Sequence, residues 1–415
     1  AVGANALDAN TTASYNTAVG RDALGANTTG NTNTAVGRVA LLSNTTGASN
    51  TAVGQGALES NTTGTLNVAV GANALDANTT GITNVAIGNV ALGANTTANN
   101  NTAVGYNSLA VNTTGHENTA VGTVSLDANT TGDLNTALGY GALSANTTAD
   151  ENTAVGYHAL VANTTGTRNV CVGANAMLSN LTGGSNTALG WGALQVNTVS
   201  NNTALGTKAL FNNSTGTQNT AVGSLCGDNI TTGDLNTMIG YNVGNSAVDV
   251  DQEIVIGSNI NGGGTNTVRI GTSAGNATLS LDGSDTSWAA ASDLRLKKDI
   301  ADSTVGLSFI KALRPVTFKW NAKNAIANSL PQYDADSSDP VYGSGKAHHG
   351  FIAQEVKTVI DAHSDVANGH NLWNTDLDGT QQVAQGALVP ILVKAIQEQN
   401  TLIEALTARI TTLEG

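Results

Sequence analysis

The stretch NTAVGRDALGANTTGNT, residues 16–32, is one copy of a unit that repeats along most of the chain. Its glycine, Gly20, recurs at steps of 17 residues from Gly3 to Gly190. One step of 16, three of 17 and one of 14 then carry the series to Gly271. The unit reads N-T-A-V-G-x-x-A-L-x-A-N-T-T-G-x-x. Self-similarity at a fixed short period predicts a repeat architecture.

The period and its residues favour one coil of a parallel β-roll or β-solenoid per unit. Each unit has two short apolar pieces, TAVG and xALxA, separated by Asn, Thr and Gly, which form turns readily and helices poorly. Neighbouring apolar residues, such as Ala18–Val19 and Ala6–Leu7, point to opposite faces of a strand. We therefore expect one face to fill the coil and the other to contact a partner chain, as in a symmetric oligomer.

Asparagine recurs twice in every unit, in series that contain Asn27 and Asn33. At the strand spacing of about 4.8 Å, such side chains can hydrogen-bond from coil to coil as ladders. The first series is interrupted near Cys226, where Ile230 stands in place of asparagine. Sixteen steps at about 4.8 Å predict a rod of roughly 75 Å.

Composition excludes several classes of function. Charged residues make up 11% of the chain and the net charge is −14, against about 25% charged residues in an average domain. The lack of a basic stripe argues against nucleic-acid binding. No apolar run reaches the roughly 18 residues of a membrane span. Cys171 and Cys226 are expected to be buried free thiols, and we expect no metal or cofactor.

The repeats over residues 1–271 resemble the heads of trimeric autotransporter adhesins, which use a related xxAIGxxAxA pattern. That resemblance implies trimers of left-handed parallel β-rolls. The period of 17 is longer than the usual coil of that family. The repeat begins in mid-unit at Ala1, so we expect the natural protein to continue before it.

Residues 292–415 have the composition of a small α+β domain, and residues 272–291 form a transition segment. A half-buried strand is expected at 315–320, and a strand that leads into a helix at 350–360. Apolar residues spaced by four and three predict a coiled coil over about 388–414. Its two seams hold Leu392, Ile396, Gln399, Ile403, Leu406, Ile410 and Leu413.

Four ordered motifs in this domain are SDLRLKKDI, GLSFIKALRPVTFKW, HHGFIAQEV and ALVPILVKAIQEQ. They closely resemble the intramolecular chaperone and self-processing domain at the C-termini of phage tail spikes and fibres, including endosialidases. The resemblance implies a domain that trimerises, templates the folding of the fibre before it, and then cuts itself off.

The same resemblance implies that Ser292 is the nucleophile and Lys297 the general base of a self-cleaving serine endopeptidase that acts once, in cis. A serine hydroxyl needs an adjacent base, and a lysine serves only where its pKa is lowered. Asp293 and Arg295 belong to the same motif, and His348 is a candidate supporting residue. The cut falls at Ala291/Ser292 or at Ser292/Asp293.

The repeat pattern predicts a mostly β fold, and the two resemblances imply a homotrimer that is a phage tail fibre located in the virion. Its expected partners are two further copies of itself, a host surface glycan or protein receptor, and other virion tail proteins through a part that precedes Ala1. Neither nucleic acid nor membrane is expected. The alternatives are a trimeric adhesin on the bacterial cell surface and a purely structural fibre without receptor binding. A glycan-cleaving enzyme is disfavoured, because the carboxylates of residues 1–291 are scattered over repeat positions.

Overall fold

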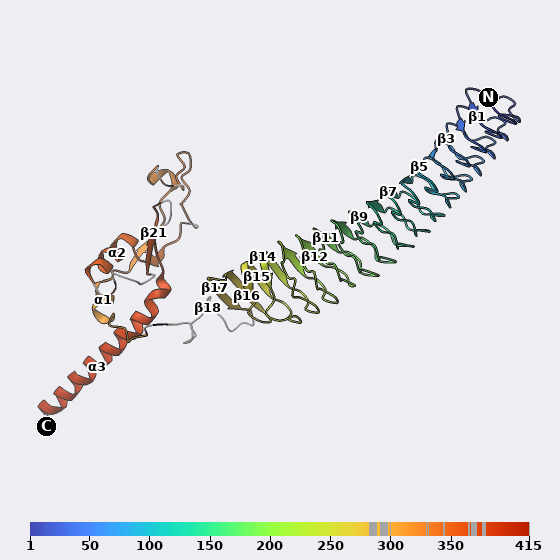
Figure 1. Cartoon of the computed structure of the whole chain (residues 1–415). Helices are drawn as coiled ribbons and strands as arrows, with labels where there is room; N and C mark the ends of the chain where they lie inside the picture. The colour runs from blue at the N-terminus through green and yellow to red at the C-terminus, as the bar shows by residue number, and fades with distance from the viewer. Residues whose placement is uncertain are drawn as a thin grey trace. The chain divides into compact units, whose positions relative to one another are not determined.

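A computed structural model describes residues 1–281, 289–290, 298, 300–328, 330, 332–342, 345–363, 366, 372–375 and 379–414. The chain divides into two compact units, Ala1–Ser292 and Asp293–Gly415. The first is a long stack of coils, and the second is a smaller group of helices and short strands (Figure 1).

The first unit is a parallel β-solenoid with one short strand in each coil (Figure 1). Each strand pairs in parallel with the strand of the next coil, so that Ala18 lies beside Ala35 and Ala35 beside Ala52. The predicted solenoid of 17-residue coils is confirmed. Its three-residue strands are β1 (Thr17–Val19), β2 (Thr34–Val36), β3 (Thr51–Val53), β4 (Val68–Val70), β5 (Val85–Ile87), β6 (Thr102–Val104), β7 (Thr119–Val121), β8 (Thr136–Leu138), β9 (Thr153–Val155), β10 (Val170–Val172), β11 (Thr187–Leu189), β12 (Thr203–Leu205) and β13 (Thr220–Val222).

Longer strands close the C-terminal end of the solenoid. β14 (Thr237–Gly244), β15 (Ile254–Asn261) and β16 (Thr267–Thr272) continue the parallel pairing. β17 (Gly275–Ser280) then pairs with β16 in the antiparallel sense, and β18 (Ala289–Ala290) pairs with β17. The sheet thus runs beyond residue 271, and the antiparallel strands cover the edge of the parallel stack, which would otherwise expose unpaired backbone groups.

The core of each coil consists of small and medium-sized side chains. In the first strand Ala18 is 1% exposed and Val19 is 40% exposed, in agreement with the predicted alternation. For the second apolar piece the prediction of opposite faces is wrong, because Ala23 and Leu24 are both fully buried. Leu24 has a φ of 52°, so this piece is a turn, and its left-handed backbone leaves the leucine inside the coil.

The predicted asparagine ladders are confirmed, and they lie next to each other, since Asn33 and Asn44 both donate to Gly47 O. In the first ladder, Nδ2 of Asn44 donates to Oδ1 of Asn27 at 2.8 Å. In the second, the backbone N–H of Asn50 donates to Oδ1 of Asn33 at 2.9 Å. These side chains are buried, so their amides satisfy backbone and side-chain groups that water cannot reach.

Both ladders end in a different residue near the C-terminal end of the solenoid. The first ends after Asn213, and Ile230 is fully buried at the next position, as the interruption in the sequence predicts. In the second, Glu253 follows Asn236, whose Oδ1 accepts the Glu253 N–H at 2.9 Å. The buried Glu253 carboxylate then accepts N–H groups from Ser246 and Gly264 and so caps the ladder.

The two cysteines are free and buried, as predicted, at positions that alanine holds in other coils. Burial raises the pKa of the Cys226 thiol to about 11, and it raises the pKa of Cys171 still further. Both thiols are therefore protonated and unreactive near neutral pH.

In the second unit the described residues form three α-helices and two short antiparallel strand pairs, β19–β20 and β21–β22. Its elements are α1 (Leu307–Ala312), β19 (Val316–Phe318), the 3₁₀ turn η2 (Lys323–Ala325), β20 (His348–Gly350), α2 (Ala353–Ala362), β21 (Trp373–Thr375), β22 (Gln381–Val383), the 3₁₀ turn η3 (Gln385–Ala387) and α3 (Leu388–Glu414). The predicted strand at 315–320 is found at 316–318, and a strand leads into a helix at 348–362 as expected.

The core of the second unit lies between α1, α2 and the start of α3. Phe309 of α1 is fully buried, and it packs with Val356 and Ile360 of α2 and with Leu388 and Ile391 of α3. The rest of α3 projects away from the other elements of this unit (Figure 1).

Candidate functional site

The predicted cleavage site lies outside the residues that the structure describes. This holds for Ser292, Lys297, Asp293 and Arg295, and for the bonds on either side of Ser292. The neighbouring Lys298 is described and exposed. The catalytic pairing of Ser292 with Lys297 therefore stays a prediction from the motif.

His348, the candidate supporting residue, lies in β20, where it pairs with Phe318 of β19. Its imidazole packs 5.7 Å from the Phe318 ring and 6.5 Å from the Trp320 ring. Its Nε2 is buried and has no hydrogen-bond partner among the described residues. The described contacts of His348 are thus aromatic packing, and its role towards Ser292 stays a prediction.

A hollow of about 670 Å³ lies beside this strand pair. Its lining includes Phe318, Trp320 and Tyr342, together with Phe351 just before α2 and Gln354 in the first turn of α2. Trp320 and Tyr342 pack edge to face at 4.9 Å. The lining is rich in aromatic side chains, and the described residues that form it include no nucleophile with an adjacent base.

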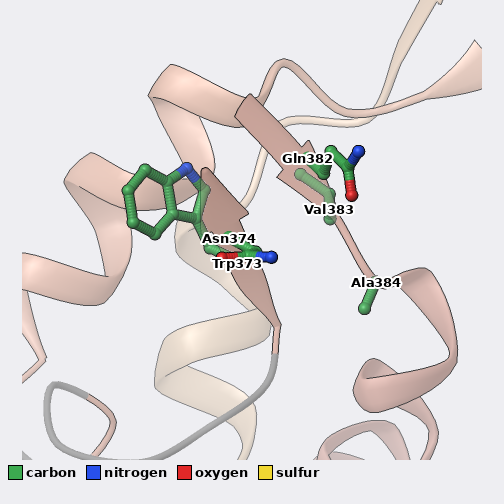
Figure 2. A pocket seen from close by; sticks show the side chains of 5 residues that line it. All are labelled: Trp373, Asn374, Gln382, Val383 and Ala384. Atoms are coloured by element: carbon green, nitrogen blue, oxygen red, sulfur yellow. The ribbon is translucent and has the colours of Figure 1, made fainter. Parts of the chain in front are cut away.

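A second hollow, of about 400 Å³, lies at the β21–β22 hairpin. Figure 2 shows that its side chains come from these two strands and the residue that follows them: Trp373, Asn374, Gln382, Val383 and Ala384. The Trp373 indole is held from two sides, since its Nε1 donates to Gln381 and the Lys357 ammonium lies 5.2 Å from its ring. Amide and apolar groups dominate this hollow, which argues against catalysis there.

Two charged contacts tie the motifs of this unit together. Nε of Arg314 donates to Glu355 Oε2 at 2.9 Å, which joins the start of β19 to the first turn of α2 and lowers the pKa of Glu355. The backbone N–H of Leu307 donates to Glu398 Oε2 at 2.8 Å, which joins α1 to α3. Sequence reasoning missed Glu398, because a contact between residues 91 positions apart leaves no local signal.

The predicted seam of α3 is exposed in the single chain. Ile396, Ile403 and Ile410 are 64%, 53% and 54% exposed. Leu406 and Leu413 are 57% and 81% exposed, and Gln399 is exposed as well. The helix is confirmed, and its apolar stripe lacks a partner within the described chain.

A second apolar stripe runs along the solenoid. The residue just before the repeat glycine is Val, Ile or Leu in all 17 coils from Val2 to Ile270. Ten of these side chains are at least 36% exposed, among them Val19, Ile87 and Leu205. Because this position never takes a polar residue, it has the character of a contact surface and not of a solvated one.

The described residues contain neither a metal-binding cluster nor a membrane-spanning helix. Those residues hold no group of three or more His, Cys, Asp or Glu side chains that could bind a metal ion. Among the helices described here, none is long and apolar enough to cross a membrane.

Comparison with known proteins identifies the start of the second unit. No curated protein and no solved structure matched the chain. Residues 292–365, however, match the family model described as the chaperone of endosialidase. The match begins at Ser292 and includes α1, β19, β20 and α2. The chain thus combines a parallel β-solenoid with a C-terminal segment similar to the chaperone of endosialidase.

Proposed function

We propose that the protein is a homotrimeric phage tail fibre whose C-terminal unit guides assembly of the solenoid and then releases itself by cutting at Ser292. The observation that carries this proposal is the match of residues 292–365 to the chaperone of endosialidase family, directly after a long repeat array. The fibre attaches the virion to a host surface glycan or protein.

The repeat array gives the chaperone its physical task. Neighbouring coils are nearly identical, so a chain that slips by one 17-residue unit against its partner loses few contacts. Repeat arrays misassemble readily for this reason. A terminal bundle that aligns three chains fixes the register before the coils pair.

Two apolar stripes support assembly from several chains. The exposed seam of α3 offers a contact at the C-terminal end, and the aliphatic residues before the repeat glycines offer one along the solenoid. Burying such residues releases about 25 cal/mol for each Å² removed from water. Both stripes would be covered in a parallel trimer.

Light scattering on the full chain tests the trimer. Ile396→Asp with Ile403→Asp places two charges in the seam. This double variant should be found as monomers or as aggregates and not as a trimer. Thr401→Asp adds a charge on the outer face of the same helix and should leave the trimer intact. A monomeric wild-type protein, or a seam variant that stays trimeric, would contradict the proposal.

Intact mass and denaturing gels test self-cleavage. The wild-type chain should yield a fragment that begins at Ser292 or Asp293, whereas Ser292→Ala and Lys297→Ala should stay uncut. Ser303→Ala and Lys298→Ala are matched controls of the same residue types and should be cut normally. An uncut wild-type chain would refute the cleavage step and leave the assembly role to the light-scattering test.

A further inference from the structure

Aromatic residues of the solenoid are concentrated at one position of the repeat. Residues 1–281 contain seven aromatic residues, and five of them directly follow a repeat glycine. These five are Tyr106, Tyr140, Tyr157, Trp191 and Tyr241, and they are between 45% and 54% exposed. Large rings placed repeatedly in water at one position are typical of a binding surface.

This aromatic column differs in character from the aliphatic stripe that we assign to the trimer contact. In other coils the same position holds Arg21, Arg38, Gln55, Asn89 and Thr123. A subunit interface does not accept charges readily, because even a paired arginine such as Arg21, which lies 3.4 Å from Asp22, would have to leave water. The column is therefore expected to face solvent in the assembled fibre as well.

Three rings of neighbouring coils form the centre of the column. Tyr157 stacks on the half-buried His158 at 4.0 Å between ring centroids, with 24° between the planes. Tyr140 stacks with Tyr157 at 5.7 Å and 14°. Tyr157 is 53% exposed in spite of both contacts, so part of its ring surface is available to a ligand.

A second aromatic cluster lies farther along the same column. The Lys208 ammonium lies 5.3 Å from the Trp191 ring and 5.0 Å from the Phe211 ring. Its charge thus holds two rings of adjacent coils in place and provides a hydrogen-bond donor beside Trp191. From Tyr140 to Lys208 the column spans four coil steps, which is about 19 Å at the strand spacing.

We propose that Tyr140, Tyr157 and Trp191 form a platform for a linear polysaccharide built of pyranose rings. The face of a pyranose ring carries C–H groups that pack on the electron-rich face of an aromatic ring, while its hydroxyl groups stay at the edge. A polymer of repeated sugars suits a surface that repeats with each coil. This inference rests on the proposed host-attachment function and places the attachment site on the solenoid.

Two other classes of partner fit the column less well. The net charge of −14 opposes nucleic acid, whose phosphates need cationic contacts. A protein partner needs about 800 Å² on each side, with an apolar centre inside a polar rim. A single column of spaced rings on a rod lacks that breadth.

A glycan array of linear neutral and acidic oligosaccharides, probed with the full chain, tests the platform. The wild-type protein should bind at least one of them, and Tyr140→Ala with Tyr157→Ala should weaken that binding by about tenfold or more. Trp191→Ala should weaken it as well, and Trp191→Phe should restore much of it. Tyr15→Ala removes an exposed ring from another repeat position and should have no effect.

The outcomes separate this inference from the proposed function. Binding that survives the double variant, a wild-type chain that binds no glycan, or capture of a protein in place of a glycan would overturn the platform. So would a double variant that loses the trimer, because the rings would then be a subunit contact. A monomeric wild-type chain with ring-dependent glycan binding would instead overturn the assembly proposal and leave the platform standing.

Discussion

The backbone N–H of Leu307 donates a hydrogen bond to Oε2 of Glu398 at 2.8 Å, across 91 positions of the chain. Leu307 is the first residue of α1, and a negative charge at a helix N-terminus is favourable. Gly306 permits the approach, since a Cβ there would lie 2.5 Å from the same oxygen. The helix that carries the proposed trimer seam is thereby fixed to the segment that matches the chaperone family.

Glu398→Ala should lower the stability of the second unit by about 1 kcal/mol, the typical effect of losing a helix cap. Glu398→Gln keeps an acceptor oxygen and should lose less. Chemical unfolding of the full chain, followed by hydrogen exchange at α1, measures the change. Glu404→Ala is the matched control, because the Glu404 hydrogen bond is to Asn400 of its own helix. Equal effects at Glu398 and Glu404 would refute the capping role.

Asp127 should make the solenoid less stable as the pH rises. Its Oδ1 is buried without a partner among the described residues, and burial raises its pKa above 3.8. The folded state therefore holds the proton more tightly than the unfolded state, so stability is lost as the pH rises from the unfolded pKa through the raised folded one. Asp127→Asn removes this loss.

Thermal unfolding of wild type and Asp127→Asn at pH 3 and pH 7 measures the effect. The melting temperature of the variant should rise relative to that of the wild type between pH 3 and pH 7. The difference between the two melting temperatures at pH 3 serves as the internal control. A difference that does not change with pH would show that the Asp127 carboxylate titrates as it does in the unfolded chain.

The sequence is sufficient to predict the parts of this protein that repeat. A fixed period, a buried inner residue that is alanine in most strands, and two asparagines in most coils determine the register and both ladders, because each coil meets only its neighbours. Leu24 shows the limit of that reasoning: a leucine with a φ of 52° contradicts local preference, and only its full burial accounts for it. Glu398 shows another limit, since it acts on a residue remote in sequence.

The asparagine ladder predicts a local cost for any break. Nδ2 of Asn78 donates to Asn61 Oδ1 at 2.8 Å and to Gly81 O at 3.0 Å, and its Oδ1 accepts from Asn95 at 2.8 Å. Asn78→Ala removes the donor to the buried Asn61 Oδ1, at a cost of about 1–3 kcal/mol. Gly81 O still accepts from Asn67 and Asn95 Nδ2 still donates to Ala98 O. Hydrogen exchange should rise in the coils on either side and remain unchanged several coils away.

Asn10→Ala is the matched control, because Asn10 is exposed at the start of the same ladder. It should have little effect on exchange. A uniform rise along the solenoid in Asn78→Ala would mean that the array unfolds as a whole, contrary to nearest-neighbour stability.

Val124 and Leu126 adopt the same unusual backbone and should respond in opposite ways to substitution. Their φ angles are 48° and 52°, in the left-handed region that costs L-residues about 1–2 kcal/mol. Val124 is half-buried, and asparagine holds its position in other coils, at Asn107 and Asn175. Asparagine tolerates this backbone far better than a β-branched residue does, so Val124→Asn should stabilise the solenoid.

Leu126 is fully buried, and Leu126→Gly should destabilise the solenoid by about 2–5 kcal/mol despite the relief of backbone strain. Denaturant midpoints of the two variants decide the matter, because a loss of stability in both would mean that packing outweighs backbone strain throughout the coil.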